Sequence, residues 1–131
     1  IGLTPQSVHA LGGYRVQGRE EAAAERLRHQ AIALEEAGCF ALVLELVPAA
    51  LADEISRSLS IPTIGIGAGV GCDGQVLVLY DALGLNQGFR PKFLKTFGDL
   101  GNGVRDALGS YVKEVREGKY PGPEHGLDRK P

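Results

Sequence analysis

A chain of 131 residues has the length of one ordinary domain, and a hydrophobic share of 44% is enough for a buried core. The net charge of −2, with no block of like charge, argues against nucleic acid or an anionic membrane as a partner, and no apolar run approaches the ~20 residues of a membrane span. Cys39 and Cys72 form no CxxC pair, so we interpret them as structural thiols of a cytoplasmic protein rather than as a disulfide or a metal site.

The first segments predict a strand end and a loop. The chain starts with Ile1 rather than Met, and residues 1–3 resemble the end of a strand, so we expect the chain to be a piece of a longer one. Pro5 is placed to start a turn or a helix. Residues 11–19 show no periodicity and predict a loop, which is either functional or a plain solvated connector.

Residues 20–37 predict the clearest helix of the chain. Glu20 and Glu21 suit the positive end of the helix dipole, and Gly38 is placed to end the helix. Apolar residues three and four positions apart form one stripe: Ala23, Leu27, Ala31 and Leu34.

The next segment, residues 38–48, is a short apolar run bounded by glycine and proline, which predicts a parallel strand buried on both faces. Its one ionisable residue, Glu45, lies at the carboxyl end, where α/β folds place their chemistry. Residue type alone leaves a second interpretation open, in which the Glu45 side chain is solvated at the end of the strand and has no catalytic role.

Pro48 is predicted to start a second helix, which ends at residues 60–62. The expected core positions of this helix are Leu51, Ile55 and Leu59. Residues 63–69 predict a short strand that runs into glycines, and residues 75–80 predict an apolar strand that ends at Asp81.

The last part of the chain predicts a helical region after Pro91, broken by Gly98, Gly101 and Gly103, and a loose tail over residues 122–131. Strands that alternate with helices predict an α/β fold with a parallel sheet. Either a small open sheet or part of a (β/α)8 barrel fits this order. Since a complete barrel needs ~250 residues, the chain could supply about half of one.

Few of the remaining residues suggest chemistry. The glycine-rich run over residues 65–71 matches neither the dinucleotide-binding nor the P-loop pattern, so Gly67 and Gly69 either let a ligand approach the backbone or let the chain turn. Asp81 is a candidate for the site or for capping the next segment. The three histidines read as solvated, and no residue is assigned as a metal ligand.

Several motifs follow one another along nearly the whole chain. They are Ile1-Gly-Leu-Thr-Pro-Gln-Ser-Val8, Gly12-Gly-Tyr-Arg-Val-Gln-Gly18, Leu42-Val-Leu-Glu-Leu-Val-Pro48, Ile61-Pro-Thr-Ile-Gly-Ile-Gly-Ala-Gly69, Asp73-Gly-Gln75, Asp81-Ala82, Pro91-Lys-Phe93 and Tyr120-Pro-Gly-Pro-Glu-His125. Together they resemble the C-terminal half of the ketopantoate hydroxymethyltransferase family.

The resemblance implies a (β/α)8 TIM barrel of the phosphoenolpyruvate/pyruvate superfamily type, with residues 1–121 running from the end of strand 5 to helix 8 and residues 122–131 as a tail. It implies transfer of a one-carbon unit from 5,10-methylenetetrahydrofolate to 3-methyl-2-oxobutanoate, giving 2-dehydropantoate for pantothenate and coenzyme A biosynthesis. Glu45 matches the glutamate that removes the C3 proton. Gly67, Gly69 and Asp81 are expected to line the substrate or cofactor pocket.

The resemblance also implies partners that this chain does not supply. A Mg²⁺ ion that polarises the substrate carbonyl is expected to bind carboxylates of the N-terminal half, so we expect the chain alone to be inactive. The family forms homo-oligomers, often decamers.

Two other hypotheses stay open. One is a non-catalytic half-barrel that acts as an interaction module through exposed strand edges. The other is a related lyase or mutase of 2-oxo acids, against which the Thr4-Pro5-Gln6-Ser7 and Gly12-Gly13-Tyr14 segments argue.

Overall fold

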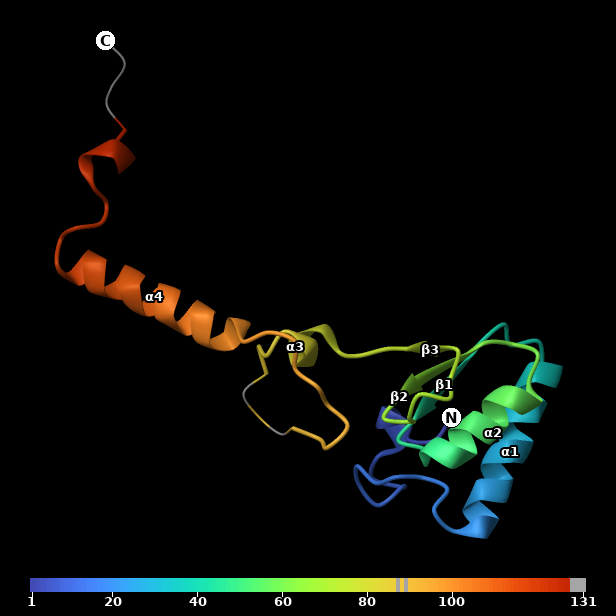
Figure 1. Ribbon diagram of the computed structural model, residues 1–131. Helices are drawn as coiled ribbons and strands as arrows, with labels where there is room; N and C mark the ends of the chain where they lie inside the picture. Colours follow the sequence, from blue (N-terminus) through green and yellow to red (C-terminus); the bar gives the residue numbers. More distant parts are fainter. Residues whose placement is uncertain (87, 89, 128–131) are drawn as a thin grey trace. The chain divides into compact units, whose positions relative to one another are not determined.

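A three-stranded parallel sheet with two helices against one face forms the first part of the chain (Figure 1). The computed structural model describes residues 1–86, 88 and 90–127, and the chain divides into two compact units, Ile1–Leu77 and Val78–Pro131. The elements of the first unit are η1 (Pro5–Ser7), α1 (Glu21–Glu36), β1 (Leu42–Glu45), α2 (Ala49–Ser58), β2 (Thr63–Ile66) and β3 (Gly74–Gln75).

The strands lie in the order β1-β2-β3, and both pairs are parallel. Gly2 forms a further parallel bridge with Glu45, so the predicted strand end at residues 1–3 is present as one isolated β-bridge beside β1. The predicted α/β class with a parallel sheet is therefore confirmed. Strands that are neighbours both in sequence and in the sheet are consistent with part of a barrel.

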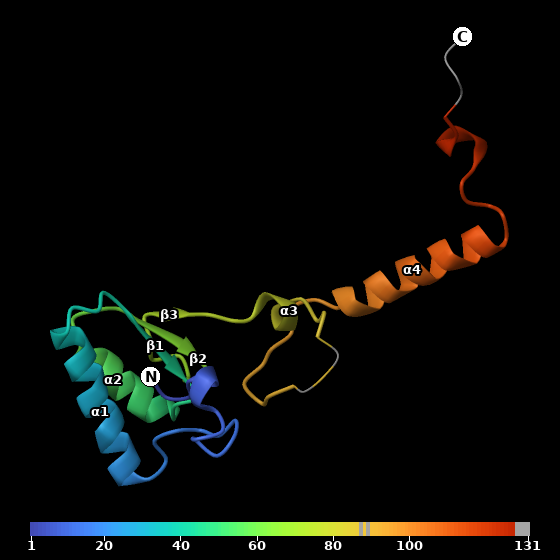
Figure 2. The ribbon, with the colours of Figure 1, turned by 180° about the vertical axis from the view of Figure 1, so that it is seen from behind.

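The helix predicted over residues 20–37 is confirmed as α1 to within one residue at each end. The second predicted helix is present as α2, but it ends at Ser58, so the predicted core position Leu59 lies just after the helix in an extended conformation. The apolar stripes of α1 and α2 pack on the sheet, and Figure 2 shows both helices on the same side of the strands. The buried core consists of Ala24, Leu27 and Ala31 from α1, Leu42 and Leu44 from β1, Val47 two residues after β1, Leu51, Ala52 and Ile55 from α2, and Ala68.

The predicted burial of the strand at residues 38–48 on both faces is wrong. Leu42 and Leu44 are buried against the helices, whereas Val43 between them is 48% exposed and Phe40 is 89% exposed. Both helices cover the same face, so neither helix of the first unit covers the face that carries Val43. The apolar run does mark a strand, but how many of its faces are buried depends on which segments lie over it.

The predicted strand over residues 75–80 is also wrong. The third strand consists of Gly74 and Gln75 alone, and its last contact with β2 is the hydrogen bond from the Val76 amide to the Gly65 carbonyl, at 3.0 Å. β2 ends at Ile66 and the chain turns away at Gly67, so a longer third strand would have no partner. Leu79–Ala82 instead form the short helix α3.

The second unit also contains α4 (Leu100–Arg116) and η2 (Pro123–His125). Gly101 and Gly103 lie inside α4, so the predicted break at these glycines is wrong. Each glycine costs a helix only about 1 kcal/mol, which a long helix tolerates. The rings of Tyr120 and His125 lie 5.1 Å apart, so the predicted tail starts with local contacts.

The tail boundary at residue 122 stays a prediction, and residues 128–131 lie outside the described residues. Within the described ranges, no helix has the length and apolar character that a membrane crossing requires.

A polar network fixes the start of β2. The Asp73 carboxylate accepts hydrogen bonds from the Thr63 amide (2.8 Å) and the Thr63 hydroxyl (3.0 Å), and the hydroxyls of Thr63 and Ser56 lie 2.7 Å apart. Thr63 is fully buried. The Thr63 bonds hold the pKa of Asp73 below its ordinary value. Asp73, which its sequence context marks only as a turn residue, thus links α2, β2 and the segment before β3.

This network predicts a pH-dependent stability. A carboxylate whose pKa is lower in the folded chain than in the unfolded chain stabilises the fold above the unfolded pKa of ~3.9, and this contribution is lost as the pH falls through the folded pKa. We therefore expect Asp73→Asn to lower the free energy of unfolding at pH 7 and the difference from wild type to shrink below about pH 4. Urea unfolding between pH 7 and pH 2.5 measures this, with the exposed Glu36→Gln on α1 as the control. An equal difference at all pH values would contradict the assignment.

Candidate active site

Glu45 is the last residue of β1, and backbone contacts on both sides fix its position. On one side its amide donates to the Ile1 carbonyl (3.0 Å), and its own carbonyl accepts from the Leu3 amide (2.8 Å). On the other side Glu45 pairs in register with Ile66 of β2. Since side chains alternate along a strand, the Glu45 side chain belongs to the face of Val43, opposite the helices.

The electrostatic environment of Glu45 suits a base. Its side chain is only partly exposed, and burial raises the pKa of its carboxyl above the ordinary value, although the positive charge of the Ile1 amino group opposes the shift. Within residues 1–86, 88 and 90–127, its carboxylate has neither a hydrogen bond nor an ion pair. A carboxylate with a raised pKa and free oxygens is a stronger proton acceptor than an ordinary glutamate.

Gly67 and Gly69 lie at the same edge of the sheet as Glu45. Gly67 directly follows Ile66, the register partner of Glu45, and both glycines have positive φ, +63° and +79°. A Cβ on Gly69 would overlap the Cβ of Ala49 at the start of α2. Packing against α2 therefore accounts for the glycine at position 69, and the role of both glycines in a ligand pocket stays a prediction.

Asp81 belongs to the second unit and lies in the first turn of α3, not at a strand end. Its carboxylate accepts a hydrogen bond from the Asn86 side-chain amide at 3.0 Å. This contact joins two side chains and is not a helix cap, and a role of Asp81 in the pocket stays a prediction.

Two residues near the candidate site were missed at the level of sequence. Leu46, directly after Glu45, has φ +50°, a left-handed conformation that residue type gives no reason to expect. The Gln75 side chain donates a hydrogen bond of 2.8 Å to the Gly69 carbonyl and so ties the glycine turn to β3. The Asp73-Gly74-Gln75 motif was a signal that pointed to this region, but not to this contact.

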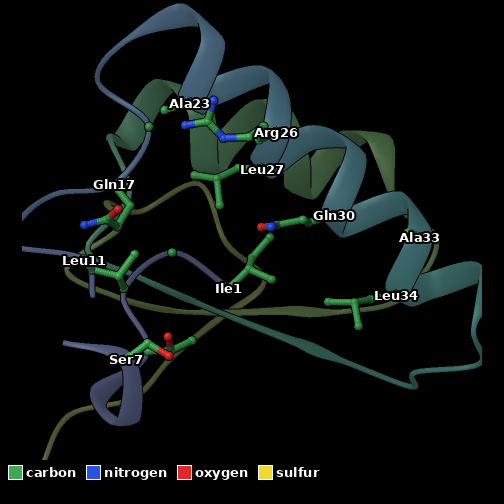
Figure 3. Close-up of a pocket in the computed structure, with 13 residues that line it drawn as sticks. Ile1, Ser7, Leu11, Gln17, Ala23, Arg26, Leu27, Gln30, Ala33 and Leu34 are labelled. Carbon is green, nitrogen blue, oxygen red and sulfur yellow. The ribbon is translucent and has the colours of Figure 1, made fainter. Parts of the chain in front are cut away.

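A cavity of about 620 Å³ lies between residues 1–18 and α1 (Figure 3). Ile1, Leu27 and Leu34 form much of its apolar wall, and Arg26 and Gln30 of α1 contribute polar groups. Glu45 and the two glycines do not line it. The cavity is therefore distinct from the predicted site.

The described residues do not form a metal site by themselves. No group of three or more His, Cys, Asp or Glu side chains among residues 1–86, 88 and 90–127 is arranged to hold an ion. Oxygen-rich coordination of Mg²⁺ takes several such ligands or bound water molecules. Any Mg²⁺ at this site would therefore need ligands from elsewhere.

Comparisons with known proteins find one family along nearly the whole chain. A family model described as ketopantoate hydroxymethyltransferase matches residues 1–123. A Magnetococcus marinus protein named 3-methyl-2-oxobutanoate hydroxymethyltransferase is 56% identical over 129 residues, which cover 98% of this chain and 48% of that protein.

Proteins of the same name from other bacteria show the same relation. Those of Halorhodospira halophila and Enterococcus faecalis are each 56% identical, over 128 and 127 residues, which cover 98% and 97% of this chain. The match takes in 46% of each of these proteins. The chain thus spans about half the length of the curated relatives it matches.

Proposed function

The chain belongs to the ketopantoate hydroxymethyltransferase family, and we propose that it supplies the general base, Glu45, for transfer of a hydroxymethyl group to 3-methyl-2-oxobutanoate. In this proposal the chain corresponds to the C-terminal half of a (β/α)8 barrel, and the donor of the one-carbon unit is 5,10-methylenetetrahydrofolate. The product is 2-dehydropantoate.

The observation that carries the proposal is the position of Glu45. Its partly buried carboxylate lies at the carboxyl end of a parallel strand, its pKa is raised by burial, and its backbone is held on both sides. Active sites of parallel α/β folds lie at this edge of the sheet.

The chemistry asked of Glu45 is removal of a weakly acidic proton. The C–H bond at C3 of the substrate lies beside a ketone, and the carboxylate accepts this proton while the electron pair of the bond forms an enolate. C3 then forms a bond to the one-carbon unit of the donor as one of that carbon's two C–N bonds breaks. Water replaces the second nitrogen and supplies the hydroxyl oxygen, and tetrahydrofolate leaves with one proton from water and the proton taken from C3. General-base catalysis of this kind contributes about 10²–10⁴-fold to the rate.

The proposal also covers the ligand pocket, the metal ion and the assembly. Gly67, Gly69 and Asp81 would contribute to the substrate or donor pocket. Because the described residues do not provide a magnesium site, the Mg²⁺ that the resemblance implies would be held by residues of a complementary segment. We also propose a cytoplasmic homo-oligomer as the working form.

A second candidate function is an interaction module without catalysis. It is favoured by the uncovered face of the sheet, where Val43 and Val76 are each 48% exposed. Exposed apolar side chains of this kind mark surfaces that associate.

Complementation distinguishes the two functions. The 131-residue chain is mixed with a polypeptide holding the residues of the Magnetococcus marinus relative that the chain does not match, and Mg²⁺ and 3-methyl-2-oxobutanoate in D₂O are added. NMR then follows exchange of the C3 proton. We expect exchange in the mixture and none with either polypeptide alone. A folded complex of the two polypeptides without exchange would overturn the enzymatic proposal and support the interaction module.

A further inference from the structure

Leu46, the residue after the candidate base, adopts a conformation that leucine rarely takes. Its φ is +50°, and it is the one residue other than glycine with positive φ among residues 1–86, 88 and 90–127. In this region the Cβ of an L-residue crowds the following carbonyl oxygen, so the conformation persists only where its surroundings enforce it.

The left-handed residue changes which way the chain faces at the end of β1. Leu42 and Leu44 are buried and Val43 is exposed, as strand alternation requires. Continued alternation would place Val47 on the face of Val43, yet Val47 is only 2% exposed and belongs to the core. Leu46 therefore ends the alternation directly after Glu45 and returns the chain to the helical side.

Both backbone polar groups of Leu46 are used to hold it. Its amide donates to the Ile66 carbonyl (3.0 Å), and its carbonyl accepts from the Gln17 amide (2.8 Å). Gly2 packs from the other side: a Cβ at this position would overlap the Glu45 carbonyl oxygen and lie 2.7 Å from Val47 Cγ2. Three separate segments thus enclose Glu45 and Leu46.

We propose that Leu46 is a positioning residue for Glu45: its left-handed conformation ends β1 at Glu45 and keeps the Glu45 side chain on the sheet face opposite the helices. The importance of this position rests on the proposed role of Glu45 as the base. Among the described residues, the one charged group that acts on Glu45 is the amino group of Ile1.

The conformation is tested with two variants that remove the same side chain, Leu46→Gly and Leu46→Ala, in the 131-residue chain. Glycine adopts positive φ without the Cβ clash, whereas alanine does not. We therefore expect hydrogen exchange of the amides of residues 46 and 17, measured by NMR, to be about 5- to 30-fold slower in Leu46→Gly than in Leu46→Ala. If Leu46→Gly folds and Leu46→Ala does not, that result would also show that position 46 tolerates glycine better than alanine.

Leu59 provides the matched control pair. It is a partly buried leucine with φ −101°, where glycine has no conformational advantage. Amides around residue 59 should therefore exchange no slower in Leu59→Gly than in Leu59→Ala. Equal or faster exchange in Leu46→Gly than in Leu46→Ala would overturn the proposal.

The effect on Glu45 is read from its side-chain carboxyl signal in a pH titration by ¹³C NMR. Leu46→Gly should keep the wild-type titration midpoint. Leu46→Val should move it towards that of an ordinary glutamate, because a β-branched residue avoids the left-handed region. An unchanged midpoint in Leu46→Val would overturn the positioning role. These measurements need no activity, so they are independent of whether Glu45 is the base.

Discussion

Glu45→Gln is expected to lower the rate of C3 proton exchange in the complemented enzyme by at least about 10²-fold. Glutamine keeps the shape of the side chain but cannot accept the proton. Because the change is nearly isosteric, binding of 3-methyl-2-oxobutanoate should change little. Exchange is measured by NMR in D₂O, and substrate binding is measured by titration calorimetry.

The control for this variant is Glu36→Gln, which makes the same change at an exposed position of α1. It should leave the rate at the wild-type value. The wild-type rate should also fall as the pH is lowered through the raised pKa of Glu45, because only the ionised carboxylate accepts a proton. Near-normal exchange in Glu45→Gln would remove Glu45 from the mechanism.

Ile55→Ala is expected to destabilise the first unit by about 2–5 kcal/mol. Ile55 is 1% exposed, and it lies on the face of α2 that packs in the core. Alanine removes three buried carbon atoms and leaves a cavity that the surrounding side chains fill only in part. Urea unfolding, followed by the NMR amide signals of β1 and β2, measures the loss.

Ile32→Ala is the matched control on the neighbouring helix. Ile32 is 41% exposed on α1, so the same change should alter the free energy of unfolding by no more than about 0.5 kcal/mol. Equal losses in the two variants would mean that α2 does not pack on the sheet as described.

The elements that could be predicted from sequence are those whose signals are local. Residues 20–37 carry an apolar stripe with a charged amino end and are followed by Gly38, and α1 follows this pattern closely. The apolar runs before Glu45 and Gly67 are bounded by Gly and Pro, and β1 and β2 lie within them. Fold class and the place of Glu45 at a strand end follow from the order of these segments.

The errors arise where a neighbouring segment decides the outcome. Residues 75–80 have strand-like composition, but β2 ends at Ile66 and its last pair with β3 is Gly65 with Gln75, so residues beyond Val76 have no strand to pair with. Val43 looks like a core residue until it is known that both helices cover the opposite face. The left-handed Leu46 is held by a hydrogen bond from its amide to the Ile66 carbonyl and by one from the Gln17 amide to its own carbonyl, and both partners lie in other segments of the chain.

The sheet order has a consequence for how the chain acquires its structure. Each strand pairs with the one synthesised just before it, and only α2 separates β1 from β2. Contacts that are close in sequence form quickly, because little loop entropy is lost in closing them. The β1-α2-β2 unit can therefore assemble on the ribosome as soon as β2 has emerged, and β3 can then add to an edge that already exists.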